Sequence, residues 1–169
     1  MVHFHPKPVY LTWRLSGSLS EDQVITAAAT AEEAFADMDR SLDSARTGPC
    51  HLRHPEVARM VVDAIHHHAK RLRYFDLHAF VVMANHVHLL ITPRVPLAVL
   101  AASLKDLTAR EAAHRLHIHG PFWQEEGYQR VVHDPTDFNR VASDIEREPV
   151  DAGMVGTPGE FPWTSAAND

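Results

Sequence analysis

The fold of this chain is decided by residues 79–92, which read AFVVMANHVHLLIT. Two apolar runs rich in β-branched residues flank a two-residue turn at 84–85, a pattern that is typical of a β-hairpin. Side chains two apart on a strand project from the same face. We therefore expect His86 and His88 to point together, within reach of one metal ion, while Val87 packs on the opposite face.

On either side of the hairpin, some segments alternate apolar and polar residues as strands do, and others repeat apolar residues at helical spacing. We expect the last strand to be interrupted at Gly127 and the last helix to end before Pro149. The order predicts an α+β fold, in which helices cover one face of an antiparallel sheet. The expected strands are 9–15, 74–83, 86–92 and 122–132, and the expected helices are 21–45, 55–72, 97–116 and 134–148.

Composition limits the class of protein. The chain has 169 residues, of which 45% are hydrophobic, so it can bury the core of one compact domain. No apolar run approaches the ~18 residues of a membrane span, and the N-terminus lacks the pattern of an export signal. The single cysteine, Cys50, excludes a disulfide scaffold and a zinc ribbon. We expect a cytoplasmic protein.

The formal net charge of −6 argues against nucleic-acid binding only until its distribution is considered. Two acidic blocks, residues 21–47 and 134–169, hold 15 of the 22 Asp and Glu residues. The rest of the chain is net basic and contains all 14 histidines. A basic surface for a nucleic acid is therefore compatible with this sequence.

The hairpin segment 79–93 resembles the His-hydrophobic-His (HUH) hairpin of the single-tyrosine transposases of bacterial insertion sequences and their REP-associated relatives. The resemblance spans nearly the whole chain. It implies an HUH transposase-like domain over 1–155 with a ferredoxin-like sheet, followed by an irregular tail over 156–169. The other segments that match, in order, are 10–19, 104–110, 122–124, 149–155 and 162–165.

The resemblance also implies a function. Family members bind single-stranded or hairpin DNA, and the ancestral activity is DNA strand cleavage and rejoining in transposition. His86 and His88 are implied to hold Mg²⁺ or Mn²⁺, which polarises the scissile phosphate. A tyrosine of the last helix attacks and forms a 5′-phosphotyrosine. Some relatives act as dimers and others as monomers, so a homodimer is one of two expectations.

This sequence departs from the family at the position of the nucleophile. Asp144 stands where the tyrosine is expected, and Glu148 stands where a polar metal ligand is expected. One interpretation is a more anionic metal site, in which Asp144 acts as the base for hydrolytic nicking. Another is a DNA-binding descendant that has lost its chemistry. Tyr128 is the remaining candidate nucleophile near this machinery, although a packing role is the preferred interpretation.

Candidate DNA contacts come from segments that the resemblance places near the bound strand. Basic side chains would contact phosphates, and an indole would stack on a base. The run His66-His67-His68 is set aside as a metal site because successive helical side chains point about 100° apart. The candidate DNA-binding residues are Arg14, Lys105, Arg110, Arg115, Arg130 and Trp123.

Overall fold

The computed structural model describes residues 6–19, 30–45 and 47–168. Its centre is a four-stranded sheet with the strand order β2-β3-β1-β4, in which each neighbouring pair is antiparallel. The predicted hairpin is confirmed as β2 and β3. The strands are β1 (Val9–Arg14), β2 (Phe75–Val82), β3 (His86–Pro93) and β4 (Tyr128–Val131).

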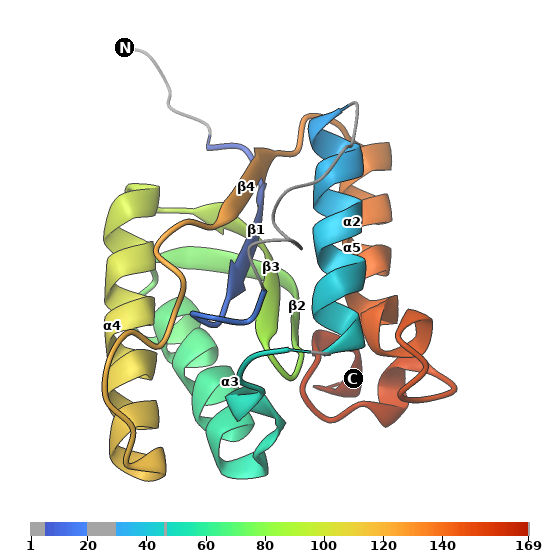
Figure 1. Ribbon diagram of the computed structural model, residues 1–169. Helices are drawn as coiled ribbons and strands as arrows, with labels where there is room; N and C mark the ends of the chain where they lie inside the picture. Colours follow the sequence, from blue (N-terminus) through green and yellow to red (C-terminus); the bar gives the residue numbers. More distant parts are fainter. Residues whose placement is uncertain (1–5, 20–29, 46, 169) are drawn as a thin grey trace.

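In the part of the chain that the structure describes, four α-helices pack on this sheet, two on each face (Figure 1). The α+β class and the antiparallel sheet are confirmed, whereas the expectation that helices cover only one face is not met. The reason lies in the strands: the first six residues of β3 are all buried, so both faces need a cover. One face carries α3 (Pro55–Lys70) and α4 (Leu97–Leu116), and the other carries α2 (Ala31–Ser44) and α5 (Pro135–Asp151).

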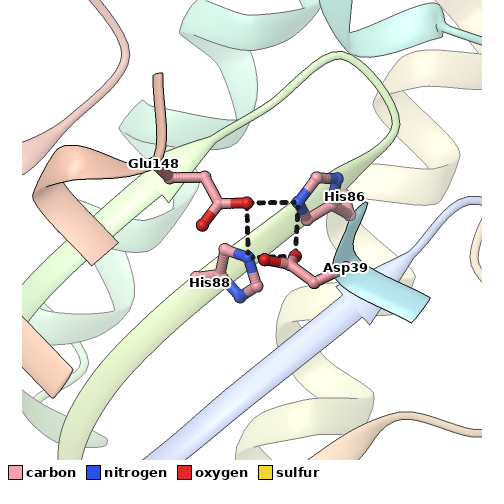
Figure 2. A group of neighbouring side chains, drawn as sticks. All are labelled: Asp39, His86, His88 and Glu148. Carbon is pink, nitrogen blue, oxygen red and sulfur yellow. Dashed lines mark hydrogen bonds and ion pairs between the residues drawn. The ribbon is translucent and has the colours of Figure 1, made fainter. Parts of the chain in front are cut away.

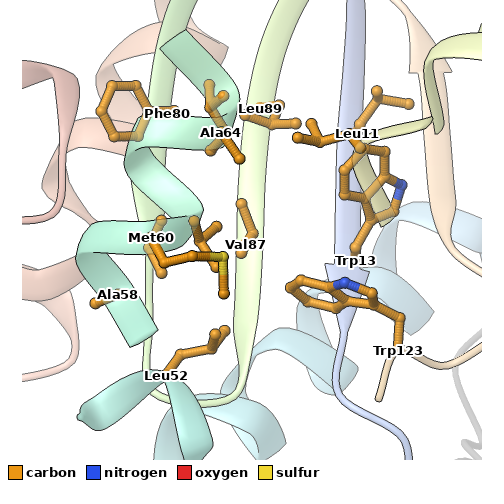
Figure 3. Close-up of a cluster of buried hydrophobic side chains, with 14 of the residues drawn as sticks. Leu11, Trp13, Leu52, Ala58, Met60, Ala64, Phe80, Val87, Leu89 and Trp123 are labelled. Carbon is orange, nitrogen blue, oxygen red and sulfur yellow. The ribbon is translucent and has the colours of Figure 1, made fainter. Parts of the chain in front are cut away.

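The larger core lies between the sheet and the pair α3 and α4 (Figure 3). Val87 enters this core together with Leu11 and Trp13 of β1, opposite Met60 and Ala64 of α3. The periodicity of the sequence located both helices within two residues of their observed bounds, because an apolar stripe at helical spacing is a local signal.

The helix expected over 21–45 is observed in its second half as α2. Its N-cap is Thr30, whose hydroxyl accepts a hydrogen bond from the backbone N–H of Glu33 at 3.1 Å. The helix ends at Ala45, which adopts a left-handed conformation. The first part of the prediction falls on residues 20–29, which lie outside the described residues.

Two predicted bounds were wrong. The strand expected over 122–132 is only β4, with a separate bridge between Trp123 and Leu15. A side chain at Gly127 would put its Cβ 2.9 Å from Cδ1 of Trp13, which explains a glycine beside this strand. Helix α5 continues past Pro149 to Asp151. Near a helix end, a proline removes one backbone hydrogen bond without preventing the last turn.

The C-terminal segment packs along the outer edge of β2. It contains two short 3₁₀ helices, Pro158–Glu160 and Ser165–Asn168. Thr164 forms a β-bridge with Val81, and the backbone N–H of Val82 donates to the Trp163 carbonyl at 2.8 Å. Part of an otherwise open edge strand is thereby covered. In the described part of the chain, no helix has both the length and the apolarity needed to cross a membrane.

Candidate metal site

Strand β3 presents two buried imidazoles on the sheet face that α2 and α5 cover. His86 is paired with Arg14 of β1, and His88 is paired with Thr12. Both histidine side chains are 0% exposed, and their ring centroids lie 4.8 Å apart. Because Val87 points into the opposite core, the alternation predicted from the sequence is observed.

Each imidazole is oriented through its Nδ1 atom. Nδ1 of His88 lies 2.7 Å from Thr12 Oγ1 and 3.2 Å from Tyr10 Oη. Nδ1 of His86 lies 2.8 Å from Asn85 Oδ1, and the Asn85 amide in turn donates to the Leu42 carbonyl at 2.9 Å. When Nδ1 carries the proton and donates in these bonds, Nε2 of each ring is left with a free lone pair.

Carboxylates from two helices meet these Nε2 atoms (Figure 2). Asp39 Oδ1 lies 3.0 Å from His88 Nε2 and 3.3 Å from His86 Nε2. Glu148 Oε1 lies 3.7 Å from each of the two nitrogens. The ligand atoms of these four residues all lie within 4.8 Å of one another. The group could therefore hold one metal ion.

Unpaired buried polar atoms at this position fit the binding of a cation. In the described part of the chain, four buried side-chain atoms have no hydrogen-bond partner, and three of them are Asp43 Oδ1, His86 Nε2 and Glu148 Oε1. Asp43 Oδ1 lies 3.7 Å from His86 Nε2. Such atoms are rare because each loses the hydration it had in water. A bound metal ion would satisfy all three.

Without a metal, Asp43 and His88 keep their protons to a higher pH than usual. Burial, followed by the neighbouring Glu148 carboxylate, raises the pKa of Asp43 to about 9. Burial alone would lower the pKa of His88, but the hydrogen bond to Asp39 and the nearby Glu148 outweigh it and raise the pKa to about 10. Glu148 is also buried, yet the two histidines hold its pKa well below its usual value. Metal binding must therefore displace protons.

Asp144 and Tyr128 line a hollow of about 530 Å³ next to these ligands, together with Asp39 and Glu148. Partial burial raises the pKa of the Asp144 carboxyl in spite of the nearby Arg140 guanidinium. The Tyr128 ring stacks on Phe35 with centroids 4.1 Å apart. This packing contact agrees with the preferred interpretation of Tyr128, and its role as a nucleophile stays a prediction.

The predicted DNA contacts divide between the two sides of the sheet. Arg14 and Arg130 lie on the side of the metal site, where Arg130 donates two hydrogen bonds to Asp137, at 2.7 and 3.3 Å. The other three basic residues, Lys105, Arg110 and Arg115, belong to α4 on the opposite side. These five residues therefore do not form one continuous basic surface around the metal site.

Trp123 is buried in the structure. Its side chain is 7% exposed and belongs to the larger core, where it packs edge-on against Trp13. Its indole N–H donates to the Thr108 hydroxyl at 2.9 Å. In this conformation the ring is covered by the protein itself, and the contact of Trp123 with a base stays a prediction.

Sequence reasoning missed Asp39 and Asp43. Both residues lie in the first acidic block, which was treated only as a source of net charge. A signal was available, since the two carboxylates are four residues apart on one helix face, next to Phe35 and Leu42 on the side that faces the protein.

Comparison with known proteins rests on structure alone, because no protein-family model and no curated protein matches the sequence. The chain is similar to a solved structure of the REP-associated tyrosine transposase bound to a REP hairpin, with a TM-score of 0.61. The chain has an HUH transposase-like fold. At 15% identity, the match covers 100% of this chain and 85% of the other. A second similar structure, of a candidate transposase from Deinococcus radiodurans R1, has 18% identity and a TM-score of 0.49, and the match covers 88% of this chain and 95% of that one.

Proposed function

We propose that this protein is a transposase-like DNA-binding protein that acts on single-stranded or hairpin DNA and holds Mg²⁺ or Mn²⁺ at His86, His88 and Glu148. The observation that carries the proposal is the convergence of two buried Nε2 atoms and a buried carboxylate on one point of an HUH-like sheet. A metal bound there would polarise a DNA phosphate oxygen and offset its charge.

The protein's own residues supply orientation and charge around that point. Thr12 and Asn85 fix the two imidazole rings, so the ligand nitrogens are positioned before a metal arrives. Of the five basic residues predicted to contact DNA, Arg14 and Arg130 are the two on the same side of the sheet as the site, and we assign them to backbone phosphates.

The chemistry at the DNA differs from that of a tyrosine transposase, because α5 contains no tyrosine. Direct attack by Asp144 would create a high-energy acyl phosphate while expelling an alkoxide, so we do not assign it as a nucleophile. Hydrolytic nicking is the second candidate function, with Asp144 taking the proton of the attacking water. Its position in the hollow beside Glu148 and its raised pKa favour that role.

A gain-of-function variant tests the proposal. In Asp144→Tyr, we expect a labelled hairpin oligonucleotide to form a covalent adduct with Mn²⁺ on a denaturing gel, and His88→Ala in the same background to abolish it. The wild type should bind the hairpin without an adduct. Free nicked product from the wild type that is lost in Asp144→Asn, but kept in the control Asp63→Asn on α3, would establish hydrolysis. Absence of hairpin binding by the wild type would overturn the proposal.

A further inference from the structure

Helix α2 is held to the sheet by few apolar contacts. Leu42 is its one fully buried side chain among the described residues. Phe35 adds a stack on Tyr128 and an edge contact with Tyr10 at 5.6 Å. A helix of 14 residues is marginal in water without tertiary packing. Its polar contacts with the rest of the protein therefore matter for where it lies.

Those polar contacts converge on the two imidazoles. Asp39 Oδ1 is closer to both Nε2 atoms than Glu148 Oε1 is, at 3.0 and 3.3 Å against 3.7 Å. Asp43, one turn further along α2, directs a buried and unpaired Oδ1 at His86 Nε2 from 3.7 Å. The helix thus brings two carboxylates to the same point.

Three carboxylates around two imidazoles can be neutralised only by protons or by a bound cation. Within the described ranges, no Lys or Arg forms an ion pair with Asp39, Asp43 or Glu148; their charged partners are the two histidines. Like charges held together in a buried place repel one another strongly. A divalent cation would reverse this repulsion and give every buried oxygen a partner.

We propose that α2 completes a closed metal centre, in which Asp39 and Asp43 are ligands together with His86, His88 and Glu148, so that the bound ion fastens α2 to the sheet. Mixed imidazole and carboxylate ligands favour a transition metal such as Mn²⁺ over Mg²⁺. This inference rests on the proposed function for the two histidines, and adds the helix that closes the site over them.

A closed centre has a consequence for DNA. Metal sites whose positions are filled by protein groups are structural, whereas catalytic sites keep a position open for substrate. With Asp39 and Asp43 in place, a phosphate oxygen can reach the ion only by displacing one of them. The carboxylates of α2 and the DNA backbone therefore compete for the same metal.

Hydrogen exchange of α2 combined with Mn²⁺ titration tests the inference. In the wild type, Mn²⁺ should slow exchange of the amides of residues 35–43 at least about tenfold. The double variant Asp39→Asn/Asp43→Asn keeps the side-chain volumes; it should bind Mn²⁺ at least about tenfold more weakly and show no such protection. Asp37→Asn, on the same helix but away from the histidines, is the matched control and should behave as the wild type.

The outcomes separate this inference from the proposed function. If the double variant binds Mn²⁺ as tightly as the wild type and exchange in α2 is unaffected by the ion, the role of α2 is refuted while the histidine site stands. If calorimetry detects no Mn²⁺ binding to the wild type, both proposals fail. A third outcome would also contradict ligation by Asp39 and Asp43. In it, His86→Ala loses Mn²⁺ binding, but Mn²⁺ still slows hydrogen exchange of α2 in the double variant.

Discussion

Replacing Thr12 by valine isolates the contribution of ring orientation to metal binding. Valine has nearly the shape of threonine, so the packing of this buried residue is retained while its hydroxyl is lost. The Nδ1 atom of His88 then loses its 2.7 Å partner and keeps only Tyr10 Oη at 3.2 Å. Loss of a partner orienting a metal-binding histidine lowers affinity by about 10–100-fold, or about 1.4–2.7 kcal/mol.

Calorimetric titration of Mn²⁺ measures this loss, and urea denaturation checks the fold. Because Tyr10 Oη remains as a partner of Nδ1, we expect the free energy of unfolding of the metal-free variant to fall by the net value of one hydrogen bond, about 0.5–1.5 kcal/mol. Thr92→Val is the matched control, because it removes another 2.7 Å hydroxyl–imidazole hydrogen bond, to His78, outside the site. Wild-type Mn²⁺ affinity in Thr12→Val would refute the claim that this hydroxyl positions His88.

Three further outcomes follow from the structure. The folded-state pKa values of His88 and Asp43, about 10 and about 9, lie above their unfolded values of 6.5 and 3.8. As pH rises, the metal-free protein should therefore lose the contribution of Asp43 between about 4 and about 9 and that of His88 between about 6.5 and about 10; urea denaturation with EDTA measures this. Mn²⁺ binding at pH 7 should release protons from the same two groups. Calorimetric titration in buffers of different ionisation enthalpy detects this release. Equal heats of binding in all buffers would contradict the claim that His88 and Asp43 are protonated in the metal-free protein. Gly48→Ala should lower the melting temperature more than Gly120→Ala, because both residues have positive φ but only at Gly48 would a Cβ lie 2.1 Å from the Gly17 carbonyl oxygen.

The hairpin and its histidines were predictable because their signal is local. Strand alternation places His86 and His88 on one face whatever the rest of the chain does. The same alternation does not say what covers that face. The apolar runs on both sides of the turn are buried on both faces, and this feature could have been taken as evidence for a second layer of helices.

The remaining ligands depend on contacts between distant segments. Asp39 precedes His86 by 47 residues, and Glu148 follows it by 62. The packing of Phe35 and Leu42 decides which side of α2 faces the sheet. The spacing of Asp39 and Asp43 places them next to that stripe, but it does not show that histidines of a distant strand lie opposite them. Trp123 was predicted to stack on a base, but it lies in the core. Its indole N–H donates to the Thr108 hydroxyl, a contact between segments that the spacing of the sequence did not indicate.

The acidity of the chain acquires a specific meaning once the two acidic blocks are placed in space. Block 21–47 supplies Asp39 and Asp43, block 134–169 supplies Asp144 and Glu148, and α2 and α5 bring the two blocks together beside β3. Without a cation, these carboxylates offer a phosphate group no positive partner; with a divalent ion, the same oxygens become ligands of a positive centre that attracts a phosphate oxygen. The net charge of −6 therefore does not oppose DNA binding in general. Under the two proposals, DNA binding near this face would depend on the metal, and α2, through Asp39 and Asp43, would compete with the DNA for that ion.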